Sequence, residues 1–266
     1  MTRTSRVLLW IFCLLVAAFV ALPVFIVVPM SFGETRLLQF PPVGFSTQWY
    51  ENFFASPRWL AATGNSLVIA AIVAVVSAVL GTMTAFALVR SKGRGRAFVT
   101  GLMTLPLVVP YVIFGAAVYG VFLQWGLTGT TLGFVIAHSV LAIPYVVVNV
   151  TTALKRMDPR LEMASASLGA TPLISFARVT LPLILPGALA GGLFAFMVSF
   201  DEVVVAIFLG GPGLETLPLL MWSSVQFQID ATIAAVSTLL IGITTVIVLA
   251  YAWLQAALKR KDSTHV

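Results

Sequence analysis

Charged residues are scarce in this chain, since Asp, Glu, Lys and Arg together make up only 9% of its 266 residues. Soluble globular domains carry about 25% charged residues. Hydrophobic residues account for 60%, and the mean hydropathy is +1.05. A chain of 28.4 kDa with this composition needs several spans of roughly 20 apolar residues. The composition therefore excludes a water-soluble enzyme domain and predicts a polytopic membrane protein.

Cysteine is nearly absent, and so are the motifs of common catalytic sites. Cys13 is the only cysteine, which excludes an intrachain disulfide and a Cys-rich metal cluster. The chain has no Gly-x-x-x-x-Gly-Lys-Ser/Thr phosphate loop, no Gly-x-Ser-x-Gly elbow and no His-Glu-x-x-His pair. His138 has no acid near it in sequence, which favours a buried, neutral, hydrogen-bonded imidazole over a proton relay. We expect no enzyme activity, no catalytic residue and no metal site in this chain.

Long apolar runs predict six transmembrane helices. The first run follows Arg3 and Arg6 and is typical of a signal anchor. Between Arg96 and Lys155 lie 58 uncharged residues, enough for two spans joined by a turn rich in Gly and Thr. The fold class is therefore an all-α integral membrane protein, with residues 1–266 forming a single transmembrane domain. The expected spans cover about residues 7–32, 65–89, 98–123, 131–153, 187–209 and 231–258.

The basic residues indicate the orientation of these spans. Of the 15 Lys and Arg residues, 13 lie in the N-terminal segment, residues 90–96, residues 155–178 or the C-terminal segment. Positively charged flanks stay on the cytoplasmic side, so both termini are expected in the cytoplasm. The formal charge of +6 is thus explained as a topology signal, and no nucleic-acid partner is expected.

The polar loop 155–182 contains two helix-start signals. Asp158 is a good N-cap and Pro159 a good first helical residue, while Gly169 suits the left-handed position after a helix end. This pattern predicts a short helix over about 159–168. Thr171 and Pro172 repeat the start signal and predict a second helix that leads to Pro182.

One face of the first short helix combines small and apolar residues. Leu161, Ala164, Ser165 and Leu168 fall on this face at helical spacing. Such a face suits close approach of a partner surface. A short amphipathic connector that lies on the lipid interface would have a similar pattern, and the spacing alone leaves both interpretations open.

The loop resembles the so-called EAA loop of ATP-binding-cassette importer permeases. That pattern is Glu-Ala-Ala, three residues, Gly, nine residues, a branched apolar residue, one residue and Leu-Pro. With Gly169 as the anchor, Val179 takes the branched position and Leu181-Pro182 the terminal pair. The chain departs from the pattern at Met163-Ala164-Ser165, because the acid, Glu162, stands one position earlier.

Other segments are similar to the spermidine/putrescine branch of these permeases. That branch often has Leu-Glu-Glu-Ala-Ala, in which Glu162 corresponds to the first acid. The remaining similar segments are Trp49-Tyr-Glu-Asn-Phe-Phe, Asn65-Ser-Leu, Ser199-Phe-Asp-Glu-Val-Val, Gly211-Pro-Gly and Thr216-Leu-Pro.

The resemblance implies a transmembrane subunit of a type I, binding-protein-dependent importer in a bacterial cytoplasmic (inner) membrane. Its implied partners are a cytoplasmic ABC ATPase dimer, a second homologous permease subunit and an extracytoplasmic solute-binding protein, besides the lipid membrane. ATP and Mg would bind the ATPase, and no cofactor is expected in this chain. The loop would form a coupling helix in a groove of the ATPase, through Asp158, Leu161, Glu162, Ala164, Ser165, Leu168, Gly169 and Pro182.

The solute implied by this branch is a polyamine such as spermidine or putrescine. Related permeases import ferric iron, phosphonates or other small molecules, and the sequence leaves these solutes open. A secondary transporter is a further alternative, but it usually has repeated halves, and no convincing repeat is present.

Two adjacent acids stand inside the fifth predicted span. Asp201 and Glu202 follow Phe200 about 14 residues after Gly187, which places them roughly 21 Å along a core about 30 Å thick. Acids at such depth face a bundle interior or water. One interpretation is a structural pair at a helix end. The other is a route for a cationic solute, in which Asp201 attracts the charge, Glu202 lies beside it and Phe200 contacts the methylenes.

Overall fold

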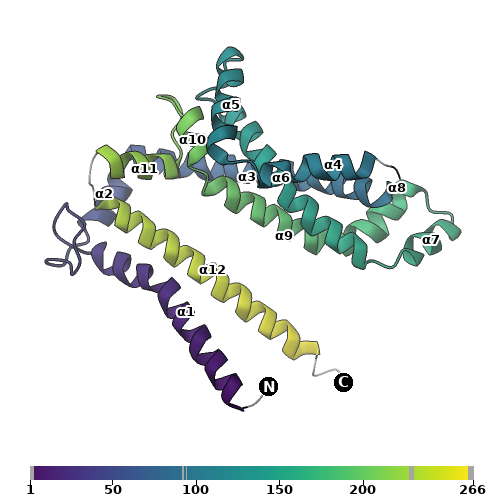
Figure 1. Cartoon of the computed structure of the whole chain (residues 1–266), viewed down its shortest axis with the longest axis horizontal. Coiled ribbons are helices and arrows are strands. Elements are labelled where there is room, and N and C mark those ends of the chain that lie inside the picture. The colour runs from purple at the N-terminus through teal and green to yellow at the C-terminus, as the bar shows by residue number, and fades with distance from the viewer. Residues whose placement is uncertain (1–2, 92, 94, 228–230, 263–266) are drawn as a thin grey trace. The chain divides into compact units, whose positions relative to one another are not determined.

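The computed structural model describes residues 3–91, 93, 95–227 and 231–262, and the regular structure in this part of the chain is helical (Figure 1). Residues 211 and 214 form an isolated β-bridge. The helices are α1 Arg3–Met30, α2 Gln48–Ala55, α3 Pro57–Arg90, α4 Gly95–Thr104, η1 Leu105–Leu107, α5 Tyr111–Gln124, α6 Thr131–Arg156, α7 Arg160–Ser167, α8 Pro172–Ser175, η2 Phe176–Thr180, α9 Leu181–Phe200, α10 Val204–Leu209, α11 Leu217–Phe227 and α12 Thr232–Asp262.

The chain divides into two compact units, and the first combines residues 1–60 with residues 223–266. In this unit α12 packs against both α1 and α2. Trp49 of α2 is buried against Ala231 and Ala235, and its indole Nε1 donates a hydrogen bond to the carbonyl oxygen of Gly33 at 2.7 Å. Trp49 therefore ties the segment that follows α1 to α2 and to the start of α12.

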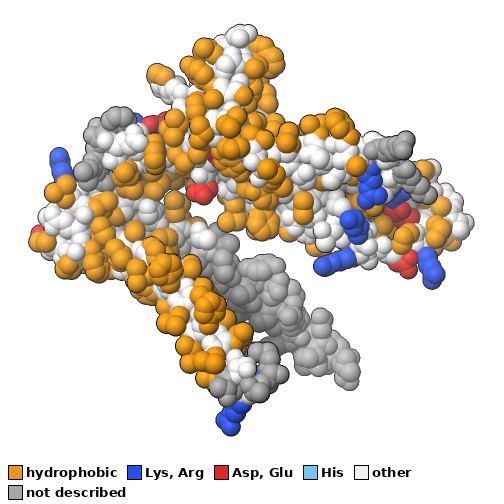
Figure 2. All heavy atoms as spheres, in the orientation of Figure 1, with side chains coloured by type: hydrophobic (Ala, Val, Ile, Leu, Met, Phe, Trp, Pro, Cys, Tyr) orange, Lys and Arg blue, Asp and Glu red, His pale blue; other side chains and the backbone are white. Residues whose placement is uncertain are grey.

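The surface of α1 is apolar on every side. Phe12, Phe19 and Phe25 expose 66%, 78% and 72% of their surface, and Figure 2 shows hydrophobic side chains along this helix. A helix that is hydrophobic all round lies in lipid or against other membrane helices. This agrees with the first predicted span.

The second unit, residues 61–222, is organised around the antiparallel pair α6 and α9. Small residues allow their backbones to approach closely. A Cβ atom on Gly191 would lie 2.8 Å from the Cα of Val146, and one on Gly187 would lie 2.9 Å from the Cβ of Ala153. Val146, Val150 and Ile184 are completely buried in the core that results.

Four helices among the described residues are long and apolar enough to cross a membrane, namely Ser5–Met30, Pro57–Arg90, Thr131–Arg156 and Pro172–Phe200. They correspond to the first, second, fourth and fifth predicted spans. The sixth prediction, 231–258, falls on α12, whose apolar part extends over Thr232–Val246 among the residues searched. The six-span count is therefore approximate.

Two predicted spans are not single helices. The segment 98–123 is divided into Gly95–Leu107 and Tyr111–Gln124, which meet at an angle of 100°. Pro106 and Pro110 lie at this break, and proline lacks the N–H that a continuous helix needs. The segment 187–209 is also interrupted, because α9 ends at Phe200 and α10 begins at Val204.

Candidate functional site

The polar loop between α6 and α9 begins with the helix cap that the sequence predicts. Asp158 Oδ1 accepts a hydrogen bond from the backbone N–H of Arg160 at 2.9 Å. The regular helix α7 begins at Arg160 and ends at Ser167, within the predicted range 159–168. A carboxylate at this position satisfies a free donor and interacts favourably with the helix N-terminus.

Gly169 terminates α7 in the left-handed conformation, with φ of +82°. The N–H of Gly169 donates to the carbonyl of Ala166, and the N–H of Ala170 donates to the carbonyl of Ser165. This pair of bonds is the Schellman motif, in which glycine avoids the steric penalty of other residues. The predicted turn between the two short helices is confirmed.

The helix start predicted at Thr171 and Pro172 is also confirmed, although the α-helix that begins there is short and continues as a π-helical turn. Thr171 Oγ1 accepts a hydrogen bond from the N–H of Ile174 at 3.4 Å, and Pro172 occupies the first turn of α8. The π-helical turn η2 then connects α8 directly to α9. Pro182 lies in the first turn of α9, two residues after the end of η2.

The face singled out from the sequence lies at the surface of the second unit. Leu161 and Leu168 expose 45% and 89% of their surface, Ala164 is exposed and Ser165 is half-buried. Leu173 of α8 is 77% exposed. Apolar side chains displayed on an otherwise polar loop are typical of an interaction surface.

Charged side chains gather at this end of the second unit (Figure 2). Lys155, Arg156 and Arg160 are exposed beside α7, whereas the sides of α3 and α9 are largely apolar. A charged end next to apolar sides is typical of helices that leave a membrane. Lys92 and Arg94, which also belong to the predicted basic loops, lie outside the described residues.

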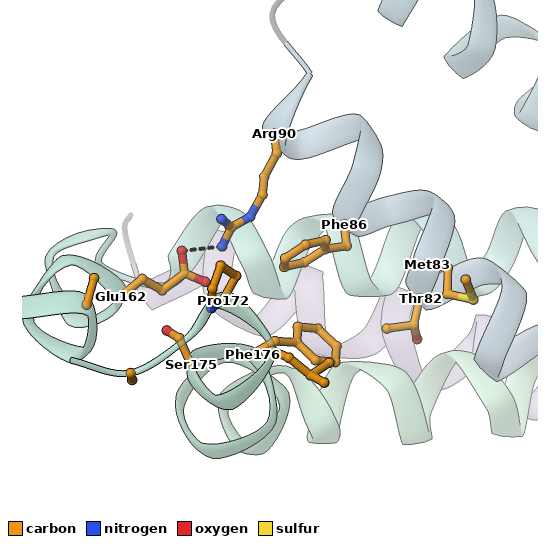
Figure 3. Close-up of a pocket in the computed structure, with 11 residues that line it drawn as sticks. Thr82, Met83, Phe86, Arg90, Glu162, Pro172, Ser175 and Phe176 are labelled. Atoms are coloured by element: carbon orange, nitrogen blue, oxygen red, sulfur yellow. Dashed lines mark hydrogen bonds and ion pairs between the residues drawn. The ribbon is translucent and has the colours of Figure 1, made fainter. Parts of the chain in front are cut away.

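Glu162 points away from the exposed face and towards the membrane helices (Figure 3). Its carboxylate pairs with the guanidinium of Arg90, at the end of α3, and accepts a hydrogen bond from the hydroxyl of Thr180 in η2. Arg90 also lies over the ring of Phe86, 4.3 Å from the ring centroid. Glu162 therefore connects α7 to the end of α3 and to η2.

A cavity of about 730 Å³ lies between α3 and the loop (Figure 3). Phe86 of α3 and Phe176 of η2 meet edge to face in its wall, with their centroids 5.0 Å apart. Arg90 and Glu162 belong to the same wall, and Met83 lines the cavity from α3. The cavity is mostly apolar, with one ion pair.

Asp201 and Glu202 take different positions at the break between α9 and α10. Asp201 is exposed, whereas Glu202 exposes only 5% of its surface. Glu202 Oε1 accepts a hydrogen bond from the N–H of Val205 at 2.7 Å. Its carboxylate therefore caps the N-terminus of α10, and the interpretation as a helix-end residue is confirmed for Glu202.

Phe200 remains beside the exposed acid. It stacks on Phe196, with ring centroids 5.8 Å apart and an interplanar angle of 11°. The last turn of α9 therefore combines a stacked aromatic pair with the carboxylate of Asp201. Contact of Phe200, Asp201 or Glu202 with a solute stays a prediction.

His138 has the buried environment that the sequence predicts. It is 1% exposed, and its Nδ1 shares a hydrogen bond of 2.9 Å with the hydroxyl of Ser199. This bond joins α6 to α9 within the core of the second unit. His138 therefore belongs to the packing of the two helices.

The structure adds contacts that the sequence analysis missed. Asn65 Nδ2 donates to the carbonyl oxygen of Glu215 at 3.0 Å, and Ser66 Oγ accepts from the N–H of Leu217 at 2.8 Å. The segment Asn65-Ser-Leu and the segment around Thr216-Leu-Pro thus meet, although about 150 residues of sequence separate them. The roles of Arg90 and Thr180 were also missed, since the only signal for Arg90 was its place at the end of an apolar run.

The chain is similar over most of its length to two curated transport proteins. It is 37% identical over 231 residues to the putrescine transport system permease protein PotI of Escherichia coli (strain K12), covering 84% of this chain and 82% of that protein. It is 32% identical over 236 residues to the spermidine/putrescine transport system permease protein PotC of the same strain, covering 88% of each.

A solved structure has the same fold. A bacterial ABC transporter involved in the import of the acidic polysaccharide alginate contains a chain that superimposes with a TM-score of 0.72 at 16% identity, covering 95% of this chain and 97% of that one. Residues 77–261 match the family described as the binding-protein-dependent transport system inner membrane component. The protein belongs to this family, as a permease of the type I ATP-binding-cassette importer fold.

Proposed function

We propose that this chain is the membrane subunit of an ATP-driven importer for polyamines such as putrescine or spermidine. PotI and PotC are named as permeases for these solutes, and their similarity covers 82% and 88% of their own lengths. The similarity therefore includes both the loop and the break between α9 and α10. Ferric iron, phosphonates and other small molecules are the alternative solutes within the same importer class.

The observation that carries the proposal is the exposed apolar face of the α7–α8 loop. Leu168 and Leu173 are largely exposed there, while Asp158, Gly169 and Thr171 fix the backbone that presents them. We infer that this loop is the coupling helix and docks in a groove of a cytoplasmic ATPase dimer. ATP and Mg bind that ATPase, so this chain acts as the mechanical gate and performs no hydrolysis.

The complete importer contains a second homologous permease and an extracytoplasmic solute-binding protein. ATP-driven closure of the ATPase dimer moves the two coupling helices, and the packed membrane helices switch the pathway between outward and inward access. Both termini and the α7–α8 loop lie on the cytoplasmic side in this arrangement. The gathering of charge at the loop end of the second unit supports this orientation (Figure 2).

The solute pathway in this proposal passes the end of α9. A polyamine carries several positive charges on a flexible apolar chain. The exposed carboxylate of Asp201 supplies the opposite charge, and the stacked rings of Phe196 and Phe200 supply π faces for ammonium groups and methylenes. Glu202 contributes indirectly, because it positions the start of α10.

Purification of the tagged permease from its native membrane tests the proposal. We expect an ABC ATPase, a second permease and a solute-binding protein to co-purify. In proteoliposomes, putrescine or spermidine should stimulate ATP hydrolysis, whereas ferric chelates, phosphonates and amino acids should not. Stimulation by another solute would support the importer class but contradict a polyamine as its substrate. An isolated chain that transports without ATP would support a secondary transporter instead.

A further inference from the structure

The acid of the loop stands one residue before the position in the family pattern and therefore lies on a different side of α7. Met163 occupies the position of the Glu in Glu-Ala-Ala and is 61% exposed, while the side chain of Glu162 is only 19% exposed. Adjacent residues on a helix differ by about 100° in direction. The shift by one residue therefore turns the carboxylate from the exposed face towards the membrane helices.

In this position one carboxylate joins three elements of the second unit. One oxygen of Glu162 pairs with Arg90 of α3, and the other accepts a hydrogen bond from Thr180. Thr180 is completely buried and immediately precedes α9. A displacement of α7 would therefore act at the same point on α3 and on the start of α9.

The connection from α7 to α3 crosses a cavity. The helix α7 packs against α8 and η2, and the cavity of about 730 Å³ lies between these elements and α3. Arg90 reaches across its wall to Glu162 and lies over the ring of Phe86, which in turn meets the ring of Phe176 edge to face (Figure 3). A loop that borders a cavity can move without a clash, so charged and aromatic contacts determine whether α3 follows it.

We propose that the Arg90–Glu162–Thr180 contact is the link by which the loop moves α3 and α9 together. Glu162 and Arg90 are then positioning residues that transmit motion within this chain, distinct from the exposed face that docks the ATPase. This inference rests on the proposed function, because the ATPase supplies the motion. A merely stabilising surface pair is the alternative, and it would leave the response of α3 to nucleotide unchanged.

The test measures that response at Met83, which lines the cavity and is 65% exposed. Met83→Cys is introduced in a Cys13→Ser background, and the importer complex is purified with its ATPase. The rate of maleimide labelling is measured without nucleotide and with ATP and vanadate. We expect nucleotide to change the rate by about fivefold or more, which is the lower range of allosteric coupling.

Charge reversal then identifies the link. Arg90→Glu and Glu162→Arg should each abolish most of the nucleotide effect, and the double variant, which restores an opposite-charge pair, should recover it. Arg156→Glu is the matched control, because Arg156 is an exposed cation at the end of α6 and should leave the effect unchanged. Glu162→Gln replaces the charge reversal if the reversed variants do not accumulate in the membrane.

The outcomes separate this inference from the proposed function. The link would be overturned if the single variants kept the full nucleotide effect. It would also be overturned if the double variant retained the ATPase normally but was as defective as the single variants. A complex that carries Met83→Cys with Arg90 and Glu162 intact but retains no ATPase would contradict the proposed function itself. Thr180→Val adds an independent arm and should weaken the effect, since it removes only the hydroxyl that holds the second oxygen of Glu162.

Discussion

At the scale of single residues, Asp201 and Glu202 show how adjacent acids acquire different roles. The sequence places both inside an apolar run, where they are costly unless they face water or protein partners. The structure exposes Asp201 and turns Glu202 onto the N-terminus of α10. The position of the two acids in the sequence predicts that they need water or protein partners. Only the break between α9 and α10 determines which carboxylate stays exposed to solvent.

The first prediction concerns Asp201, whose exposed carboxylate is proposed to attract the solute. Asp201→Asn keeps nearly the same shape and removes the charge. We expect the half-saturating concentration for a labelled polyamine to rise about tenfold, which corresponds to about 1.4 kcal/mol. Uptake at matched membrane levels measures this, with co-purification of the ATPase as the control for assembly. An unchanged uptake curve would remove Asp201 from the pathway.

The second prediction concerns Glu202, whose carboxylate caps α10. Glu202→Ala removes the acceptor for the N–H of Val205 and should lower the free energy of unfolding by about 1 kcal/mol, as loss of an N-cap does. Glu202→Gln retains a side-chain oxygen and should be milder. Thermal unfolding of the purified permease in detergent distinguishes the two. Equal melting temperatures for Glu202→Ala and the unchanged protein would contradict the capping role.

At the scale of elements, sequence signals between neighbouring residues were sufficient to predict the turns and caps of the loop. The contacts that the loop makes with distant residues could not be predicted in this way. The cap at Asp158, the left-handed Gly169 and the start at Thr171 depend on neighbouring residues, and all three are confirmed. The pairing of Glu162 with Arg90 joins residues 72 positions apart. No periodicity in sequence encodes such a contact.

Helix continuity was the other feature that sequence analysis predicted incompletely. The apolar runs at 98–123 and 187–209 have the length of a span, so hydropathy alone favours one helix in each. Pro106 and Pro110 remove backbone donors in the first run. In the second run, Glu202 supplies a cap that starts α10 after a break. Local hydrogen bonding therefore overrides the apolar pattern at both sites.

The third prediction concerns the turn and the exposed face of the α7–α8 loop. Gly169 has φ of +82°, so Gly169→Ala should cost about 1–2 kcal/mol, and Gly169→Pro should disrupt the turn. Ala164→Glu places a charge on the exposed face beside Leu161 and Leu168. We expect both Gly169→Pro and Ala164→Glu to reduce ATPase docking and transport without loss of membrane insertion.

Two measurements check the loop prediction. Co-purification of the ATPase reports docking, and the amount of permease in the membrane reports insertion. Ser167→Ala is a suitable control, because its exposed hydroxyl bonds only within α7, to the carbonyl of Met163. Normal docking and transport with Ala164→Glu would favour the interpretation of the loop as a connector on the lipid interface.

At the scale of the whole molecule, the distribution of charge predicts how the chain crosses the membrane. Thirteen of the 15 basic residues lie in segments assigned to the cytoplasm, and the remaining two, Arg36 and Arg58, lie in the segment between the first two spans. Basic flanks resist translocation. We therefore expect the topology to follow from charge, even where the helices themselves are broken.

The last prediction tests this topology by cysteine labelling in a Cys13→Ser background. Ser91→Cys and Thr171→Cys lie at exposed positions in the two predicted cytoplasmic loops, and Thr47→Cys lies at an exposed position in the predicted outer segment. A membrane-impermeant maleimide added to spheroplasts should label Thr47→Cys alone. After permeabilisation, the other two variants should react as well, because the intact membrane was what kept the reagent from them. Labelling of Ser91→Cys or Thr171→Cys in intact spheroplasts would show that the loop faces outward, where it could not meet a cytoplasmic ATPase.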